Sequence, residues 1–146
     1  MSEQRQGGFL IAKIHRIGGR IFARMLRDRG LEIDPAHGRV LFLLWQEGSM
    51  AINELAKRVS LGRSTLTNTI DRLEAAGQIV RVRSADDRRK ILIELTPENR
   101  ALHELYDDVS AEMARLFYRG FSKDEAARFD EYLERVLANL AGSETR

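Results

Sequence analysis

Residues 62–76 carry polar side chains whose types and spacing suit them to reading the edges of DNA bases. Leu66, Ile70 and Leu73 recur at the spacing of one helix face, which would hold this helix against a core. The opposite side would display Arg63, Ser64, Thr65, Thr67, Asn68 and Arg72. Arginine can bind guanine and asparagine can bind adenine through paired hydrogen bonds, and threonine offers a hydroxyl or a methyl group. Because most surface helices have a polar, solvated face, this pattern alone leaves that alternative open.

A second charged segment follows at Ser84–Lys90, between two stretches that alternate apolar and polar residues. Ile79–Arg83 and Ile91–Leu95 have the period of strands, so the segment is predicted to be the tip of a β-hairpin. The tip holds Asp86, Asp87, Arg88, Arg89 and Lys90. A basic tip on a narrow hairpin can enter the minor groove of DNA, where negative potential favours arginine. The aspartates also suit a solvated mixed-charge turn, although they can equally hold a guanidinium group by bidentate pairing.

Helical patterns surround these two segments and must position them. Apolar spacing and end signals predict helices over about 9–30, 35–45, 52–59, 62–76, 97–119 and 122–141. A cap residue precedes a helical proline at Asp34-Pro35 and again at Thr96-Pro97, and Ser122–Glu125 is a capping box. Ser60–Gly62 is a short link of the kind that joins the two helices of a helix-turn-helix. The predicted fold is mainly α with a small β-hairpin wing: a winged helix-turn-helix with further helices at both ends of the chain.

Four motifs belong together in this sequence: Leu61–Gly77 (LGRSTLTNTIDRLEAAG), Asp87–Arg89 in the hairpin, Leu95–Pro97 after it, and Glu54–Ala56 upstream. As a set they resemble the MarR family of bacterial transcriptional regulators, and the resemblance covers essentially the whole chain. It implies a homodimeric winged-helix repressor or activator, with dimerising terminal helices and often a small-molecule effector. The residues that it assigns to the major groove are Ser64, Thr65, Thr67 and Asn68. It assigns Arg89 to the minor groove, oriented by Asp87.

The chain departs from the family pattern at two positions. Asn99 stands where the family usually has glycine. Since it falls in a first helical turn, where asparagine is acceptable, no functional loss is expected. Ala51 stands where the family often has a serine or threonine cap, so the third helix is expected to start less firmly.

The terminal helices carry more apolar surface than one small winged-helix core can cover. The residues that need partners are Phe9, Leu10, Ile14, Ile17, Phe117, Phe121, Phe129, Leu133, Val136 and Leu140. Packing within the chain would cover some of them, but we favour a twofold homodimer. Within residues 1–146 we therefore predict a helical dimerisation region at 9–30 and 97–141 and a DNA-binding region at 34–96, with its recognition helix at 62–76 and its wing at 79–96. Two recognition helices would meet half-sites about one helical turn, ~34 Å, apart on pseudo-palindromic DNA.

Effector binding has weaker support in the sequence. His15, His37 and His103 are the only histidines, and they lack the spacing of metal ligands, so neither a metal nor a cofactor is expected. His37 with Arg16 or Arg20 would suit an aromatic or anionic small molecule between the helical and DNA-binding regions, where the resembling family often has its pocket. His15 completes this candidate effector set.

The composition excludes several classes of function. The chain has no cysteines, which rules out disulfides and thiol chemistry. It also lacks a glycine-rich phosphate loop, Gly-x-Ser-x-Gly and His-Glu-x-x-His, so it is not expected to be an enzyme. The longest apolar run, Val40–Trp45, is too short to span a bilayer, and no apolar signal segment opens the chain. We expect a cytoplasmic protein without a membrane partner.

Charge is unevenly distributed along the 146 residues. Residues 1–100 hold 18 basic and 12 acidic residues, whereas residues 101–146 hold 6 and 10. A basic first two-thirds suits contact with a polyanion such as double-stranded DNA. Together with these features, the resemblance to the MarR family implies a sequence-specific transcriptional regulator, a homodimeric repressor of pseudo-palindromic operators that a small effector releases. The alternative is a winged-helix module that binds a protein and no DNA.

Overall fold

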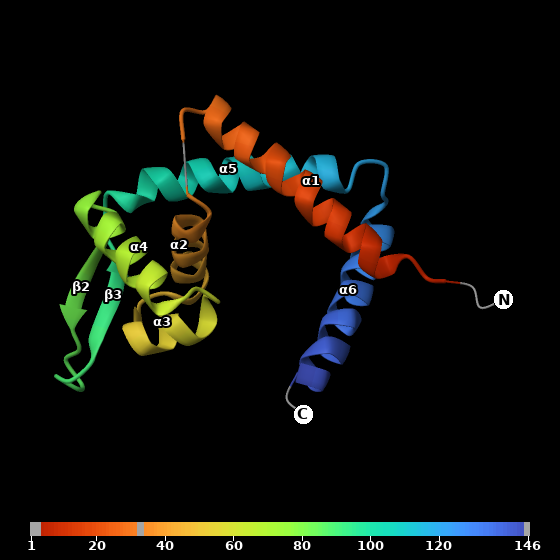
Figure 1. Ribbon diagram of the computed structural model, residues 1–146. Helices are drawn as coiled ribbons and strands as arrows, with labels where there is room; N and C mark the ends of the chain where they lie inside the picture. Colours follow the sequence, from red (N-terminus) through yellow and green to blue (C-terminus); the bar gives the residue numbers. More distant parts are fainter. Residues whose placement is uncertain (1–3, 32–33, 145–146) are drawn as a thin grey trace. The chain divides into compact units, whose positions relative to one another are not determined.

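The computed structural model describes residues 4–31 and 34–144 and divides the chain into two compact units (Figure 1). The first unit extends to Val109 and the second begins at Ser110, so helix α5 (Asn99–Phe117) contributes to both. The first unit also contains α1 (Gly7–Asp28), α2 (Pro35–Glu47), β1 (Met50–Ala51), α3 (Ile52–Arg58), α4 (Arg63–Ala75), β2 (Ile79–Arg83) and β3 (Ile91–Leu95). The second unit adds α6 (Lys123–Glu144). The predicted winged helix-turn-helix is confirmed. Among the described residues, no helix is long and apolar enough to cross a membrane.

Hydrogen bonds at the helix ends show which of the predicted caps form. Asp34 Oδ1 accepts a hydrogen bond from the backbone N–H of Ala36 at 2.8 Å, as an N-cap should. The prediction for Thr96 was wrong. Its hydroxyl donates to the carbonyl oxygen of Gly77, and α5 begins two residues later than expected, at Asn99.

The sheet contains one strand more than the predicted hairpin. Its order is β1-β3-β2, antiparallel throughout, with Arg81 of β2 and Met50 of β1 both opposite Ile93. Strand β1 has two residues, too few for any alternation to be visible in the sequence. Ala51 leaves β1 directly into α3 and provides no side-chain cap, as expected. Pairing with β3 therefore holds the start of α3 where a cap residue is missing.

The core of the first unit lies beneath α4 and the sheet. Its buried members are Val40, Leu41, Leu44, Met50, Leu55, Val59, Leu66, Ile70, Leu73, Ile79 and Ile93. Leu66, Ile70 and Leu73 are thus buried as predicted. On α3, Leu55 is buried and Ala56 is exposed. Helices α2 and α4 pack together, and α4 also packs on β2 (Figure 1).

The second unit is held by local contacts around the turn between α5 and α6. The capping box forms as predicted: the N–H of Ser122 donates to Glu125 Oε1 at 2.9 Å, and the N–H of Glu125 donates to Ser122 Oγ at 3.1 Å. Phe117, Tyr118, Phe121 and Phe129 form an aromatic cluster around this turn. No residue of α6 is buried, and Leu137 is 66% exposed. Much of the apolar stripe on the terminal helices is therefore open in the single chain.

Candidate nucleic-acid interface

Helix α4 presents the predicted reading residues to solvent. Its buried side consists of Leu66, Thr69, Ile70 and Leu73. Every candidate on the other side is exposed: Arg63, Ser64, Thr65, Thr67, Asn68 and Arg72. These side chains occupy the first two turns and the last turn of a helix that its core contacts hold in place. An exposed polar face on a second helix of this kind has the chemistry and position to enter a major groove.

The turn before α4 determines where this helix begins. Ser60 adopts a positive φ of 53°, a conformation that few residues other than glycine adopt. Gly62 follows as the N-cap and contributes no side-chain hydrogen bond, while its carbonyl oxygen accepts from the N–H of Leu66 at 2.9 Å. The chain can thus reverse between α3 and α4 within the short link that the sequence predicted.

At its other end α4 stops in a glycine-dependent motif. Gly77 has φ +76°, and its N–H donates to the carbonyl oxygen of Glu74 at 3.0 Å. The N–H of Gln78 donates to the carbonyl oxygen of Leu73 at 2.9 Å, which completes a Schellman motif. Strand β2 starts at the next residue, Ile79, so the recognition helix and the wing share one short junction.

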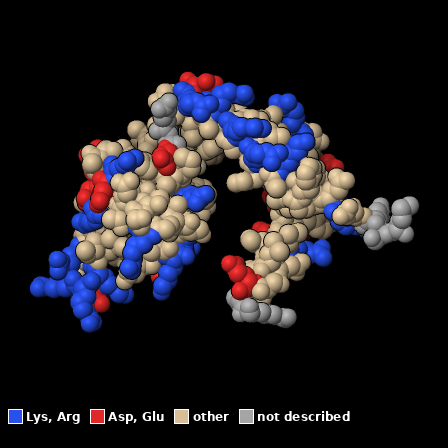
Figure 2. Space-filling model, in the orientation of Figure 1, with Lys and Arg blue, Asp and Glu red and all other residues tan. Residues whose placement is uncertain are grey.

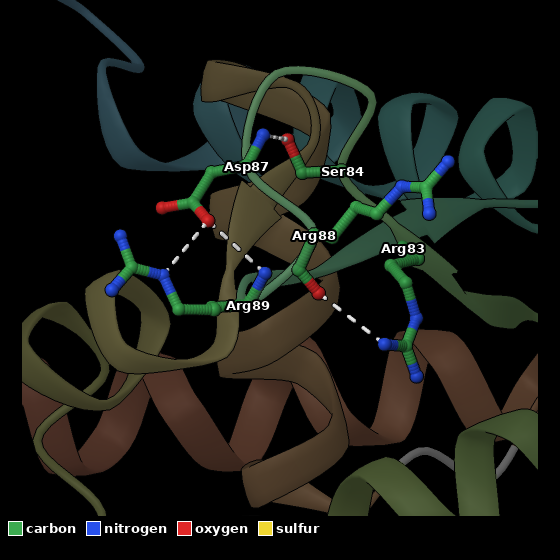
Figure 3. A network of polar contacts seen from close by, with 5 residues as sticks. All are labelled: Arg83, Ser84, Asp87, Arg88 and Arg89. Atoms are coloured by element: carbon green, nitrogen blue, oxygen red, sulfur yellow. Dashed lines mark hydrogen bonds and ion pairs between the residues drawn. The ribbon is translucent and has the colours of Figure 1, made fainter.

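The tip of the wing is ordered by its own polar contacts (Figure 3). Asp87 Oδ1 accepts from the backbone N–H of Arg89 at 3.0 Å and from its Nε at 3.3 Å. The N–H of Asp87 donates to Ser84 Oγ at 3.3 Å, and Arg83 Nη1 donates to the carbonyl oxygen of Arg88 at 3.4 Å. The bond to Arg89 uses one carboxylate oxygen and is therefore not the bidentate fork that we considered.

The side chain of Arg89 projects into solvent and is 91% exposed. An ion pair this exposed contributes little to stability, about 0–1 kcal/mol. Figure 2 shows Lys and Arg side chains gathered over the end of the hairpin, where Arg88, Arg89 and Lys90 are all exposed. This tip has the charge and the width to approach a minor groove.

A residue that the sequence analysis missed joins the wing to α4. Arg81 of β2 donates from Nη1 to Glu74 Oε1 and from Nη2 to Asp71 Oδ1, both at 2.6 Å. The hydrogen bond to Asp71 raises the pKa of Arg81 above its ordinary value, so the group is a permanent cation. The sequence does show two acidic residues three positions apart on α4, which could bind a basic side chain. It does not show which face of β2 packs against α4, so Arg81 could not be identified as their partner. Arg81 thereby ties the reading helix to the wing.

A second group that the sequence did not reveal lies between α3 and the tip of the wing. A groove of about 420 Å³ is lined by Asn53, Glu54 and Lys57 from α3 and by Arg89 and Lys90 from the wing. Three of these five side chains are lysine or arginine. Such a groove can accept a backbone phosphate beside the tip. Helix α3 thus adds Lys57 to the candidate contacts.

The first unit also contains an apolar pocket of about 580 Å³ between α1, α2 and α5. His15, Arg16 and Arg20 of the predicted effector set line it. His37 does not line it. On α2 the lining residues are Pro35, Gly38, Arg39 and Phe42, which share one helix face, and His37 lies outside that face. The basic residue that α2 contributes to the pocket wall is thus Arg39 rather than His37.

Aromatic rings complete the pocket wall. Phe22 of α1 and Tyr106 of α5 line it, with their ring centroids 5.2 Å apart at 75°. Burial raises the pKa of Tyr106 above its ordinary value, so its phenol remains a neutral hydrogen-bond donor. Aromatic walls with arginines at the edge can hold a small, flat anion.

The fold and these surfaces define a winged helix-turn-helix protein of the DNA-binding type. The family model described as MarR family matches residues 33–91. The solved structure of transcriptional regulator PA3341 is 32% identical, with a TM-score of 0.79, and the match covers 92% of this chain and 98% of that one. The chain therefore belongs to the MarR family.

Two further relatives carry information about regulation. BpsR of Bordetella bronchiseptica, whose structure concerns regulation of its DNA binding by 6-hydroxynicotinic acid, is 25% identical with a TM-score of 0.72, over 90% of this chain and 98% of that one. The homoprotocatechuate degradative operon repressor of Escherichia coli is 29% identical over 68% of each chain. Two other curated transcriptional regulators are 40% and 35% identical, but the chain spans only 32% and 45% of their lengths. The kind of function that these relatives share is not enzymatic.

Proposed function

We propose that this protein is a homodimeric transcriptional repressor that binds a pseudo-palindromic DNA operator and is released by a small aromatic acid. The observation that carries the proposal is the pairing of two elements on one junction: the exposed polar face of α4 and the wing tip, where Asp87 orients Arg89. The family relationship supports it independently. Binding to chromosomal DNA would place its action in the cytoplasm.

In this proposal α4 enters the major groove. Ser64, Thr65, Thr67 and Asn68 contact base edges, with Arg63 and Arg72 at the two ends of the face. Arg89 enters the adjacent minor groove. Arg88, Lys90 and Lys57 bind phosphates on either side, where they supply affinity without sequence information.

The dimer is inferred from the open apolar stripes. Phe9 is 67% exposed on α1, and α6 exposes Val136, Leu137 and Leu140. Surfaces of this kind in a soluble chain mark an interaction site. A twofold arrangement through residues 9–30 and 97–141 would cover them and would present two copies of α4 to half-sites about one turn, ~34 Å, apart.

Effector release is inferred from the pocket. Its aromatic walls and its arginines suit an aromatic carboxylate, and two relatives are named for aromatic compounds of this type. A ligand that binds one arrangement of the dimer better than another shifts the population toward it. We propose that the occupied pocket favours a spacing of the two α4 helices that does not match the operator.

The experiment that tests the proposal is a selection of fragmented genomic DNA by the purified protein at moderate salt. Recovery of a pseudo-palindrome with half-sites about one turn apart would support a dimeric regulator and provide a defined fragment. If the folded protein enriches no DNA, the protein-binding module becomes the better description. Calorimetry with salicylate and with 6-hydroxynicotinic acid tests the effector separately. If neither acid binds, effector release by this class of ligand is wrong.

A further inference from the structure

Asn99 is the most completely buried polar side chain described in the first unit, with 2% of its surface exposed. Trp45 Nε1 donates a hydrogen bond to Asn99 Oδ1 at 2.5 Å, and Asn99 Nδ2 donates to Gln78 Oε1 at 2.8 Å. An indole N–H can only donate, so it must face the amide oxygen and the Asn99 NH₂ group must face Gln78. One side chain at the start of α5 therefore joins α2 to the segment between α4 and β2.

The Gln78 end of this bridge is the junction between the recognition helix and the wing. The N–H of Gln78 donates to the carbonyl oxygen of Leu73 at the end of α4. The carbonyl oxygen of Gln78 accepts from the N–H of Thr96 at 3.2 Å. The Thr96 hydroxyl in turn donates to Gly77. A displacement of Gln78 would thus alter the end of α4 and the start of β2 together.

The Trp45 end of the bridge reaches the wall of the pocket. The indole ring stacks on His103 with centroids 4.5 Å apart and an angle of 3°, and it lies 4.9 Å from the Tyr106 ring. Tyr106 and its neighbour Phe22 both line the pocket. A single indole is therefore in contact both with a pocket residue and, through Asn99, with the reading elements.

We propose that Asn99 is a positioning residue that sets the junction of α4 and the wing and couples it to the pocket through Trp45. The coupling half of this inference rests on the proposed effector function, whereas the positioning half does not. The sequence suggested only that asparagine is tolerated at this position. The Asn99 side chain is buried and bonds to two partners, and a glycine at this position has no side chain that could make these bonds.

The size of the effect follows from the two hydrogen bonds. A net intramolecular hydrogen bond is worth about two- to tenfold in an equilibrium constant, and a buried group that loses its partner costs more. Asn99→Leu removes both bonds and leaves the Trp45 N–H unpaired. Gln78→Ala removes only the bond toward the reading elements. Asn99→Asp retains an acceptor for Trp45 and, after rotation of the Gln78 amide, an acceptor for Gln78 as well.

The experiment uses the 146-residue protein and the DNA fragment recovered by selection. Trp45 is the only tryptophan, so its fluorescence reports on this bridge directly. For wild type, Asn99→Leu, Gln78→Ala and Asn99→Asp, we would measure the Kd for the fragment, the change of Trp45 emission on DNA binding, and the ratio of Kd with and without saturating 6-hydroxynicotinic acid. Gln46→Ala on the exposed side of α2 is the matched control, and thermal unfolding identifies any variant that does not fold.

We expect Asn99→Leu and Gln78→Ala to weaken DNA binding by about two- to tenfold each. In both variants the emission change on DNA binding should be lost, and the Kd ratio should fall toward one. Gln46→Ala should behave as wild type, and Asn99→Asp, which keeps both acceptors but buries a carboxylate, should lose less DNA affinity than Asn99→Leu. Folded Asn99→Leu and Gln78→Ala variants with wild-type Kd and emission changes would overturn the positioning role. The coupling would be overturned if these variants bind 6-hydroxynicotinic acid normally and keep the wild-type ratio of DNA Kd with and without the acid. If wild type does not bind the acid, that result would count against the effector proposal alone.

Discussion

Arg81 has two roles at α4, and replacing it by alanine separates them. The guanidinium neutralises Asp71 and Glu74, and it also fixes the angle between the recognition helix and the wing. The carboxylates are 58% and 40% exposed, so each pair has the strength of a surface ion pair, about 0.2–1 kcal/mol. The free energy of unfolding should therefore fall by only about 1 kcal/mol, and the protein should remain folded.

The effect on DNA binding is expected to be larger than electrostatics alone can explain. A carboxylate ~10 Å from a phosphate in water repels it by about 0.4 kcal/mol before salt screening. Two released carboxylates would thus weaken binding by less than about fourfold. Loss of the fixed angle would instead cost the arginine contact of the wing, about 1–3 kcal/mol. We therefore expect Arg81→Ala to weaken binding by more than about fivefold.

Fluorescence anisotropy with the selected fragment, measured over a series of salt concentrations, provides the assay. The combined variant Asp71→Asn, Glu74→Gln, Arg81→Ala removes the repulsion but not the loss of angle, so it should recover less than fourfold in affinity. Arg81 itself is assigned no phosphate contact, so the slope of log K against log salt should fall no further than it does for Arg89→Ala, the wing contact that this variant loses. Binding of Arg81→Ala within fourfold of wild type, or complete recovery in the combined variant, would refute the reasoning.

Four further outcomes are expected from the proposed interface. Arg89→Ala should weaken DNA binding while the dimer persists in sedimentation, and retained affinity with an unchanged salt slope would contradict the wing role. Asn68→Ala should change base preference at one operator position by about 1–3 kcal/mol, whereas an equal loss on all sequences would assign it to a phosphate. Arg16→Ala should abolish calorimetric binding of 6-hydroxynicotinic acid, while His37→Ala, outside the pocket lining, should not; the reverse result would remove the acid from this pocket. Leu137→Glu should yield folded monomers in sedimentation, and an unchanged dimer would exclude this part of α6 from the interface.

Local signals in the sequence were sufficient for most of the winged helix. The inner stripe of α4 is visible because residues three and four apart share a helix face whatever lies beneath them. The caps at Asp34 and Ser122 were equally predictable, since each bonds to a backbone group two or three residues away. The pairing of Asp87 with Arg89 is local for the same reason, and the exposure of the reading residues follows from the burial of the opposite side.

Contacts between distant segments were beyond the reach of such signals. Strand β1 exists because β3 offers it a partner some forty residues away, and two residues carry no pattern of their own. Thr96 does not cap α5, and its hydroxyl instead donates to the carbonyl oxygen of Gly77, nineteen residues earlier. His37 and Arg39 differ in their access to the pocket only through the rotation of α2 against its neighbours.

By itself the sequence determined the order of the elements, the polar face of α4 and the charge of the wing tip. These features depend on residue type and on the fixed periods of helix and strand. Only the tertiary structure decided that Arg81 holds α4, that Lys57 joins the wing residues and that Asn99 bridges Trp45 to Gln78. The physical reason is that a side chain contacts the groups that lie near it in space. That distance is set by the packing of the whole core and not by any stretch of sequence around the residue.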